Sequence, residues 1–135
     1  MELDFGIEAN NSNRCKAIFK NNDSIRVPDI YEEFTRDRVL VMSFEKGIPV
    51  THVKEIHRQG IDLKDLARLI SESFVHMIFK EGFVHADPHP GNLFVRPNPD
   101  GSGRPQLVIL DHGIYTELGE ETRLSYNKLW RGILV

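Results

Sequence analysis

This sequence contains two stretches that decide its fold: Phe83-Val84-His85-Ala86-Asp87-Pro88-His89-Pro90-Gly91-Asn92-Leu93-Phe94-Val95 and Leu107-Val108-Ile109-Leu110-Asp111-His112-Gly113. Each combines apolar, strand-like residues with a carboxylate placed at a loop. The first loop adds an amide, Asn92, five residues after its carboxylate, Asp87. This layout is typical of a site for phosphoryl transfer.

The spacing has a chemical reason. Phosphoryl transfer needs a carboxylate that orients the acceptor and hard oxygen ligands that hold Mg²⁺, because the chemistry is mainly positioning and charge neutralisation. Asp87 suits the first role. Asn92 returns toward the same pocket after the tight turn at 88–91, where prolines restrict the backbone and a glycine permits a bend. Asp111 follows the strand formers at 107–110, so we expect it at the end of a buried strand, as a second Mg²⁺ ligand beside Asn92.

The order of these residues resembles a known superfamily. His85-x-Asp87-x-x-x-x-Asn92, followed by Asp111-His112-Gly113, is the catalytic-loop and metal-loop pair of protein-kinase-like proteins, with His112 where ordinary kinases usually carry phenylalanine. The fuller wording, His-Ala-Asp-Pro-His-Pro-Gly-Asn and then Leu-Asp-His-Gly, resembles the UbiB or AarF-domain atypical kinases. The acidic pair in Glu2-Leu3-Asp4 matches a third motif of that family, and the resemblance runs from Glu2 to about Trp130.

The resemblance implies a fold and a division of the chain. It predicts an α+β, protein-kinase-like fold, mostly the large lobe with a truncated small lobe. Residues 1–44 would be a remnant of the small lobe with the hinge strand, and residues 45–135 the part of the large lobe with the catalytic and metal loops. The chain looks cut at both ends, since the phosphate-covering loop and its lysine would lie before Met1.

The resemblance also implies a function. It predicts an atypical kinase or ATPase that uses Mg²⁺ and ATP, linked to coenzyme Q and lipid metabolism in mitochondria or plastids, with possible association with a lipid or membrane surface. Backbone groups of Ser43, Phe44 and Glu45 would bind the adenine. Glu2 and Asp4 would add to the metal or nucleotide site. His85 would support the catalytic loop, whereas the role of His89 stays open.

Three other functions remain open. The chain could be a catalytically dead regulator that binds a nucleotide or a lipid. It could be a small-molecule phosphotransferase of the aminoglycoside or choline kinase type, which shares the His-x-Asp-x-x-x-x-Asn loop. The alternating His85, Asp87 and His89, together with Asp111 and His112, could instead bind zinc or iron.

Composition limits the remaining classes. A chain of 135 residues with 40% apolar residues suits one globular domain. The net charge of −3 and the lack of a basic run argue against a nucleic-acid partner. The lone cysteine, Cys15, cannot form an internal disulfide, and we expect it to be a packed side chain. No apolar run approaches the roughly 20 residues of a spanning helix.

The secondary structure follows from periodicity and from breakers. We expect helices at 4–20, 50–58, 62–82 and 120–134, an extended edge segment at 25–31, a turn at 35–37, and strands at 38–44, 93–95 and 107–110. The best helix has Asp62 as its N-cap and ends at Gly82, with Ile61 and Leu66 as a hydrophobic staple. The polar loop 97–105 joins the last two strands as an exposed hairpin.

The last predicted helix carries an apolar face: Tyr126, Leu129, Trp130, Ile133 and Leu134. We expect that face to be uncovered in the isolated chain. The isolated chain should therefore be poorly stable, prone to self-association and inactive as a phosphotransferase.

Overall fold

The structure is a computed structural model that describes residues 4–134. Its elements, in chain order, are α1 (Phe5–Ile18), β1 (Ile25–Arg26), β2 (Ile48–Pro49), α2 (Val53–Arg58), α3 (Leu63–Val75), the π-helical segment η1 (His76–Glu81), β3 (Phe83–His85), the 3₁₀ turn η2 (Pro90–Asn92), β4 (Leu93–Pro97), β5 (Pro105–Ile109), β6 (Tyr115–Glu117) and α4 (Glu120–Leu134). Helices and strands are mixed, as the sequence predicts.

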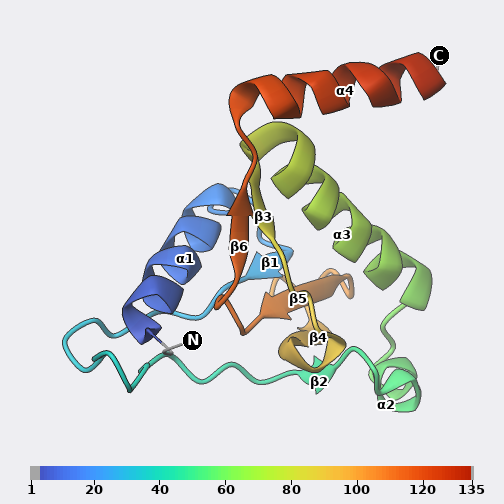
Figure 1. The fold of residues 1–135 in the computed structure, drawn as a ribbon. Helices are drawn as coiled ribbons and strands as arrows, with labels where there is room; N and C mark the ends of the chain where they lie inside the picture. The colour runs from blue at the N-terminus through green and yellow to red at the C-terminus, as the bar shows by residue number, and fades with distance from the viewer. Residues whose placement is uncertain (1–3, 135) are drawn as a thin grey trace.

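The strands form two small sheets between the helices (Figure 1). The larger sheet has the order β1-β5-β4-β2, in which β1 runs parallel to β5 and the other pairs are antiparallel. The smaller sheet pairs β3 with β6. Because β3 enters the loop at 86–89 and β6 leaves the loop at 111–114, this second sheet holds the two loops side by side.

The core surrounds β5, all five residues of which are buried. β5 is an inner strand: β4 pairs with all five of its residues, and β1 pairs with Leu107 and Val108 on the other side. Apolar side chains from every layer pack around it: Cys15, Phe19, Ile25, Val27, Ile56, Ile61, Leu66, Met77, Leu93, Val95, Leu107 and Ile109. The predicted buried strand before Asp111 is confirmed.

The predicted central helix is confirmed from its first residue to its last turn. The Asp62 carboxylate accepts hydrogen bonds from the N–H groups of Lys64 and Asp65, and Ile61 and Leu66 are both buried, as a hydrophobic staple requires. α3 continues as η1 up to Gly82. Gly82 has φ +66°, a left-handed conformation that ends the helix and that favours glycine.

α1 packs its small residues against the sheets. Its buried residues are Ala9, Ser12 and Cys15, which follow one another by three positions along one face. Burial raises the pKa of the Cys15 thiol to about 11, and the neighbouring Tyr115 hydroxyl offsets this only in part. The prediction of a packed cysteine is confirmed, since Cys15 is 1% exposed.

The hairpin and the last helix also form as predicted. β4 and β5 pair antiparallel with Phe94 opposite Val108, around the polar loop that joins them. α4 lies across the far end of α3, next to η1 (Figure 1). Its apolar residues remain largely exposed, Ile133 by 63% and Leu134 by 78%. Among residues 4–134, no helix is long and apolar enough to cross a membrane.

The predicted strand at 38–44 is wrong. This segment forms two isolated bridges, Arg36 with Val39 and Ile30 with Met42, and no continuous ladder. The turn expected at 35–37 forms at 37–38, between the bridge partners Arg36 and Val39. Two backbone hydrogen bonds flank the bridge between Ile30 and Met42: Tyr31 N–H donates to Val41 O, and Ser43 N–H donates to Asp29 O. A run of strand formers needs a partner along its length, and here the partner is only a short irregular segment.

Candidate functional site

The centre of the site is a contact between the two predicted metal ligands. The Asn92 side-chain amide donates a hydrogen bond to Asp111 Oδ2 at 2.8 Å. The backbone supports the contact, because Leu110 N–H donates to Asn92 O at 3.1 Å. The other carboxylate oxygen of Asp111 accepts from Gly113 N–H at 2.9 Å. An amide and a carboxylate from loops 19 residues apart therefore lie side by side.

His85 connects the two loops through hydrogen bonds of its buried ring. Its Nδ1 accepts a hydrogen bond from Asp87 N–H at 3.3 Å, so its Nε2 carries the proton and donates to Asp111 O at 2.7 Å. The ring is buried, 4% exposed. This arrangement agrees with the expected role of His85 as a support for the catalytic loop.

Asp87 and His89 lie on the exposed loop between β3 and β4. Asp87 is exposed, and within residues 4–134 no hydrogen bond is made to its carboxylate, so a substrate hydroxyl could reach it. The His89 ring caps the following turn, since its Nδ1 accepts from Gly91 N–H at 3.0 Å, and Asn92 N–H donates to His89 O at 2.9 Å. The turn that carries Asn92 back toward Asp111 is thus stabilised locally, and this gives His89 a structural contact.

His112 is the most enclosed polar residue of the site. It is 1% exposed, and its Nε2 donates to Ile109 O at 3.0 Å. Its Nδ1 therefore accepts from the Tyr115 hydroxyl at 2.9 Å. Both ring nitrogens of His112, like those of His85, are used within the chain. The alternative of a zinc or iron site built on these histidines is therefore not supported, because ligation would break these hydrogen bonds.

α1 contributes two residues that sequence reasoning missed, Glu8 and Asn11. His112 N–H donates to Glu8 Oε1 at 3.4 Å, and the Asn11 side-chain amide donates to His112 O at 2.9 Å. The predicted ligand Asp4 instead caps α1 by accepting from Gly6 N–H, and it is exposed. The other predicted ligand, Glu2, lies outside the described residues.

Electrostatics make Glu8 unusual. Burial raises its pKa above the usual value and the negative charge of Asp111 adds to the increase, while the hydrogen bond from His112 N–H partly offsets both. Two carboxylates so close to each other repel, and a bound cation would relieve this repulsion. Glu8 lies four residues after Asp4, and Asn11 lies three residues after Glu8, so all three share one face of the helix. This spacing was the signal in the sequence by which Glu8 and Asn11 could have been found.

The expected hinge residues lie apart from these loops. Ser43 is already engaged, since its N–H donates to Asp29 O and its hydroxyl to Glu45 at 2.9 Å. The Glu45 carboxylate, 7% exposed, pairs with Arg26 at 2.7 Å and with Arg96 at 3.0 Å. Phe44 is 87% exposed. Adenine binding by this segment stays a prediction, and the Ser43 N–H is not free for it.

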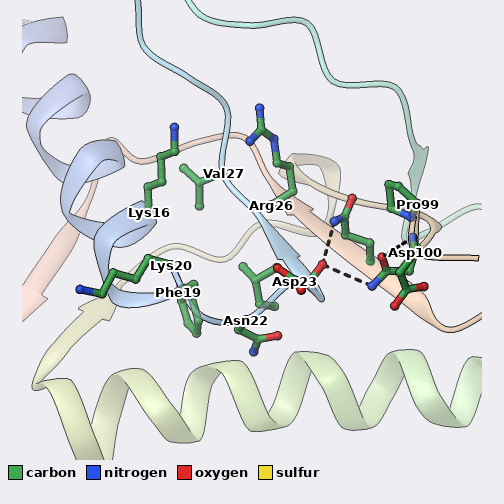
Figure 2. Close-up of a pocket in the computed structure, with 12 residues that line it drawn as sticks. Lys16, Phe19, Lys20, Asn22, Asp23, Arg26, Val27, Pro99 and Asp100 are labelled. Atoms are coloured by element: carbon green, nitrogen blue, oxygen red, sulfur yellow. Dashed lines mark hydrogen bonds between the residues drawn. The ribbon is translucent and has the colours of Figure 1, made fainter. Parts of the chain in front are cut away.

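A separate cavity of about 470 Å³ lies between the end of α1, β1 and the β4–β5 loop (Figure 2). Several of its polar groups already have partners within the chain. Lys16 pairs with Asp29, and the side-chain amides of Asn98 and Gln106 donate to Asp23 O at 3.3 and 2.8 Å. None of the predicted site residues lines this cavity. We assign no ligand to it.

Comparisons with known proteins give the family. The ABC1 atypical kinase-like domain matches residues 1–135. The chain is 43% identical over 132 residues to the "Probable serine/threonine-protein kinase abkB" of Dictyostelium discoideum, covering 98% of this chain and 20% of that protein. It is 41% identical over 134 residues to AarF domain-containing protein kinase 1 of Xenopus tropicalis, covering 99% and 25%. The chain thus spans about a fifth to a quarter of the length of these relatives.

A solved structure shows the fold. The erythromycin complex of Rv3197 from Mycobacterium tuberculosis superposes with a TM-score of 0.68 and 22% identity, over 86% of this chain and 27% of that one. The expected kinase-like α+β fold is confirmed, as a part of such a domain. By its sequence, the chain belongs to the ABC1 atypical kinase-like family.

Proposed function

We propose that this chain carries the metal and acceptor side of a phosphoryl-transfer site that uses Mg²⁺ and ATP. The observation that supports it is the 2.8 Å contact between Asn92 and Asp111, which brings an amide and a carboxylate within reach of one ion. Hard oxygen ligands of this kind suit Mg²⁺, and Mg²⁺ supplies positive charge to phosphate oxygens.

The roles follow from the contacts. The carboxylate of Asp111 accepts hydrogen bonds from an N–H and an amide, and among the described residues no cation pairs with it. It would be the main metal ligand, with the amide of Asn92 turning its oxygen toward the ion. Asp87, whose carboxylate is accessible, would orient the hydroxyl group that accepts the phosphoryl group and take its proton.

The wider biology is part of the same proposal. We infer a link to coenzyme Q and lipid metabolism in mitochondria or plastids, and contact with a lipid or membrane surface, from the family resemblance alone. We further infer that the isolated chain self-associates through the exposed apolar residues of α4, Leu129, Ile133 and Leu134. Light scattering of the chain measures this, and a monomer at all concentrations would contradict it.

The decisive experiment compares two Asp→Asn changes. Binding of ATP is measured by calorimetry with and without Mg²⁺ for the wild type, D111N and D100N. D111N should weaken Mg²⁺-dependent binding by more than about 100-fold, since it removes a ligand charge. D100N is the matched control, because Asp100 is an exposed residue of the β4–β5 loop.

Equal binding by D111N and D100N would contradict the proposed metal role. A second variant, D87N, separates binding from chemistry. In a polypeptide that extends this chain to the length of its relatives, D87N should bind Mg·ATP normally and transfer phosphate roughly 100-fold to 10⁴-fold more slowly. Binding without any transfer in the wild type would instead favour a regulator that binds nucleotide. Transfer to aminoglycosides or choline would favour the small-molecule phosphotransferase.

A further inference from the structure

The loop from Asp111 to Gly113 is held through the residue between its ends, His112. All four hydrogen-bonding groups of His112 have partners within the chain: Glu8 for its N–H, Asn11 for its C=O, Ile109 for its Nε2 and Tyr115 for its Nδ1. A residue this enclosed has one orientation available. The peptide that joins it to Asp111 is therefore oriented as well.

Tyr115 is the partner that determines the orientation of the ring. The Nε2 of His112 must carry the proton, since Ile109 O can only accept. The remaining lone pair on Nδ1 needs a donor, and the Tyr115 hydroxyl at 2.9 Å is that donor. Without it, a buried nitrogen would have no partner, and the ring would gain by turning to find one.

The ring of Tyr115 is itself fixed from several sides. It stacks on Phe83 with 4.3 Å between the ring centroids, and it lies 5.0 Å from the His85 ring. Backbone pairing of His85 with Tyr115 joins β3 to β6 at the same point. Since His85 also donates to Asp111 O, Tyr115 lies against both residues that determine where the Asp111 backbone runs.

We propose that Tyr115 is the positioning residue for Asp111, and that its hydroxyl acts through His112 to hold the carboxylate at the cation site. The proposal rests on the proposed function, because it takes Asp111 as the ligand of a divalent cation. It adds to that function a residue that touches neither the cation nor a substrate. Displacements well below 1 Å are enough to weaken a metal ligand, so losing one hydrogen bond in its support should be measurable.

The test measures cation affinity in the 135-residue chain with Mn²⁺ as the probe. Broadening of the amide NMR signals of Asn92 and Gly113 during a Mn²⁺ titration gives an apparent Kd. Y115F keeps the stacked ring and removes only the hydroxyl. We expect its affinity to fall by about tenfold, as is typical of groups that orient a metal ligand.

The matched control is Y126F. Tyr126 also stacks on a phenylalanine, Phe79, at 5.5 Å, but it lies on α4, away from Asp111. Y126F should leave the Mn²⁺ affinity unchanged. Thermal melts of both variants accompany the titration. A purely structural role for Tyr115 would lower the melting temperature while the affinity of the folded protein stayed at the wild-type value, and that result would overturn the proposal.

Two further variants make the outcome specific. H112F removes the same hydrogen bond from its other end, together with the bond to Ile109 O, and it should lower the affinity at least as much as Y115F. Adding Y115F to H112F should then cost nothing more, whereas additive losses would overturn the proposal. If Y115F does not fold, H112F carries the test, and unchanged affinity in folded H112F overturns it. D111N distinguishes failure of the proposed function from failure of this inference. If D111N still binds Mn²⁺, the proposed function is refuted. If D111N loses Mn²⁺ binding while Y115F binds Mn²⁺ normally, only this inference is refuted.

Discussion

The runs at 107–110 and at 38–44 are alike in sequence and different in structure. Both are continuous strand formers, and each is followed by a carboxylate, Asp111 and Glu45. The first run forms β5, with a strand on either side, while the second forms only isolated bridges. Strand-forming residues therefore become a strand only where a partner lies along them, and the two carboxylates end in different surroundings.

The two carboxylates differ in how their charge is balanced. Glu45 is buried between two cations, Arg26 and Arg96, and it also accepts from the Ser43 hydroxyl. Asp111 has neutral donors only and a second carboxylate, Glu8, close by. A neutralised carboxylate contributes to stability, whereas an unbalanced one is available to a cation. The difference between them can be measured.

The largest effect is expected for Glu45→Gln. The change removes the charge that Arg26 and Arg96 share, and it leaves two partly buried guanidinium groups without their common partner. We expect the free energy of unfolding to fall by about 2 kcal/mol, less than for a fully buried pair because both arginines retain some contact with water. Urea denaturation followed by circular dichroism measures it.

The control is Glu55→Gln. Glu55 pairs with Arg58 at 3.1 Å on the exposed surface of α2, so its loss should change the unfolding free energy by less than about 0.5 kcal/mol. Equal effects at Glu45 and Glu55 would mean that the network around Glu45 is no more than a set of surface ion pairs. The contrast with Asp111 would then disappear.

The elements that local sequence determines were predictable. The N-cap at Asp62, the stop at Gly82, the hairpin around 97–105 and the last helix all follow from residues near one another in the chain, and all are confirmed. Asn92 and Asp111 were found for the same reason, as each ends a recognisable loop. The motif fixes their spacing, although the sequence alone does not show that they touch.

The missed features depend on contacts between distant residues. The strand at 38–44 failed because its partner is decided by the whole fold. Glu8 and Asn11 were missed because they reach His112 across more than 100 positions, and their helical spacing from Asp4 does not show what they contact. The parallel pairing of β1 with β5 is likewise set by packing. Sequence reasoning thus found the loops and their support at His85, and missed the contacts that α1 makes with them.

A second prediction uses pH on the same carboxylate. Burial alone would raise the pKa of Glu45, but hydrogen bonds from Arg26 and Ser43 outweigh it and hold the pKa below its usual value of 4.5. A lowered pKa in the folded state means that the unfolded chain binds more protons in this range. The stability that Glu45 contributes is therefore present above pH 4.5 and is lost as the pH falls through its folded-state pKa.

The measurement is the difference in unfolding free energy between wild type and E45Q at several pH values. The difference should be full at neutral pH, begin to shrink below about pH 4.5 and fade in more acidic solution. Taking the difference cancels the other carboxylates, which titrate in both proteins. A difference that stays constant into strongly acidic solution would show that Glu45 stabilises the fold by its shape and not by its charge.

The smallest effect is expected for Asp111→Asn, tested on stability and without any metal. An asparagine fits the same space, and its side-chain oxygen still accepts from Gly113 N–H. The NH₂ group of the new asparagine replaces Oδ2 of Asp111. The Asn92 amide can turn so that its oxygen accepts a hydrogen bond from this NH₂ group, which replaces the present 2.8 Å contact. The change also removes the repulsion between Asp111 and Glu8. We expect the free energy of unfolding to change by less than about 1 kcal/mol, in either direction.

Urea denaturation of D111N beside E45Q, in a buffer with a chelator, measures the contrast directly. If D111N lost as much stability as E45Q, Asp111 would be a structural carboxylate like Glu45, and its unbalanced charge would no longer argue for a cation site.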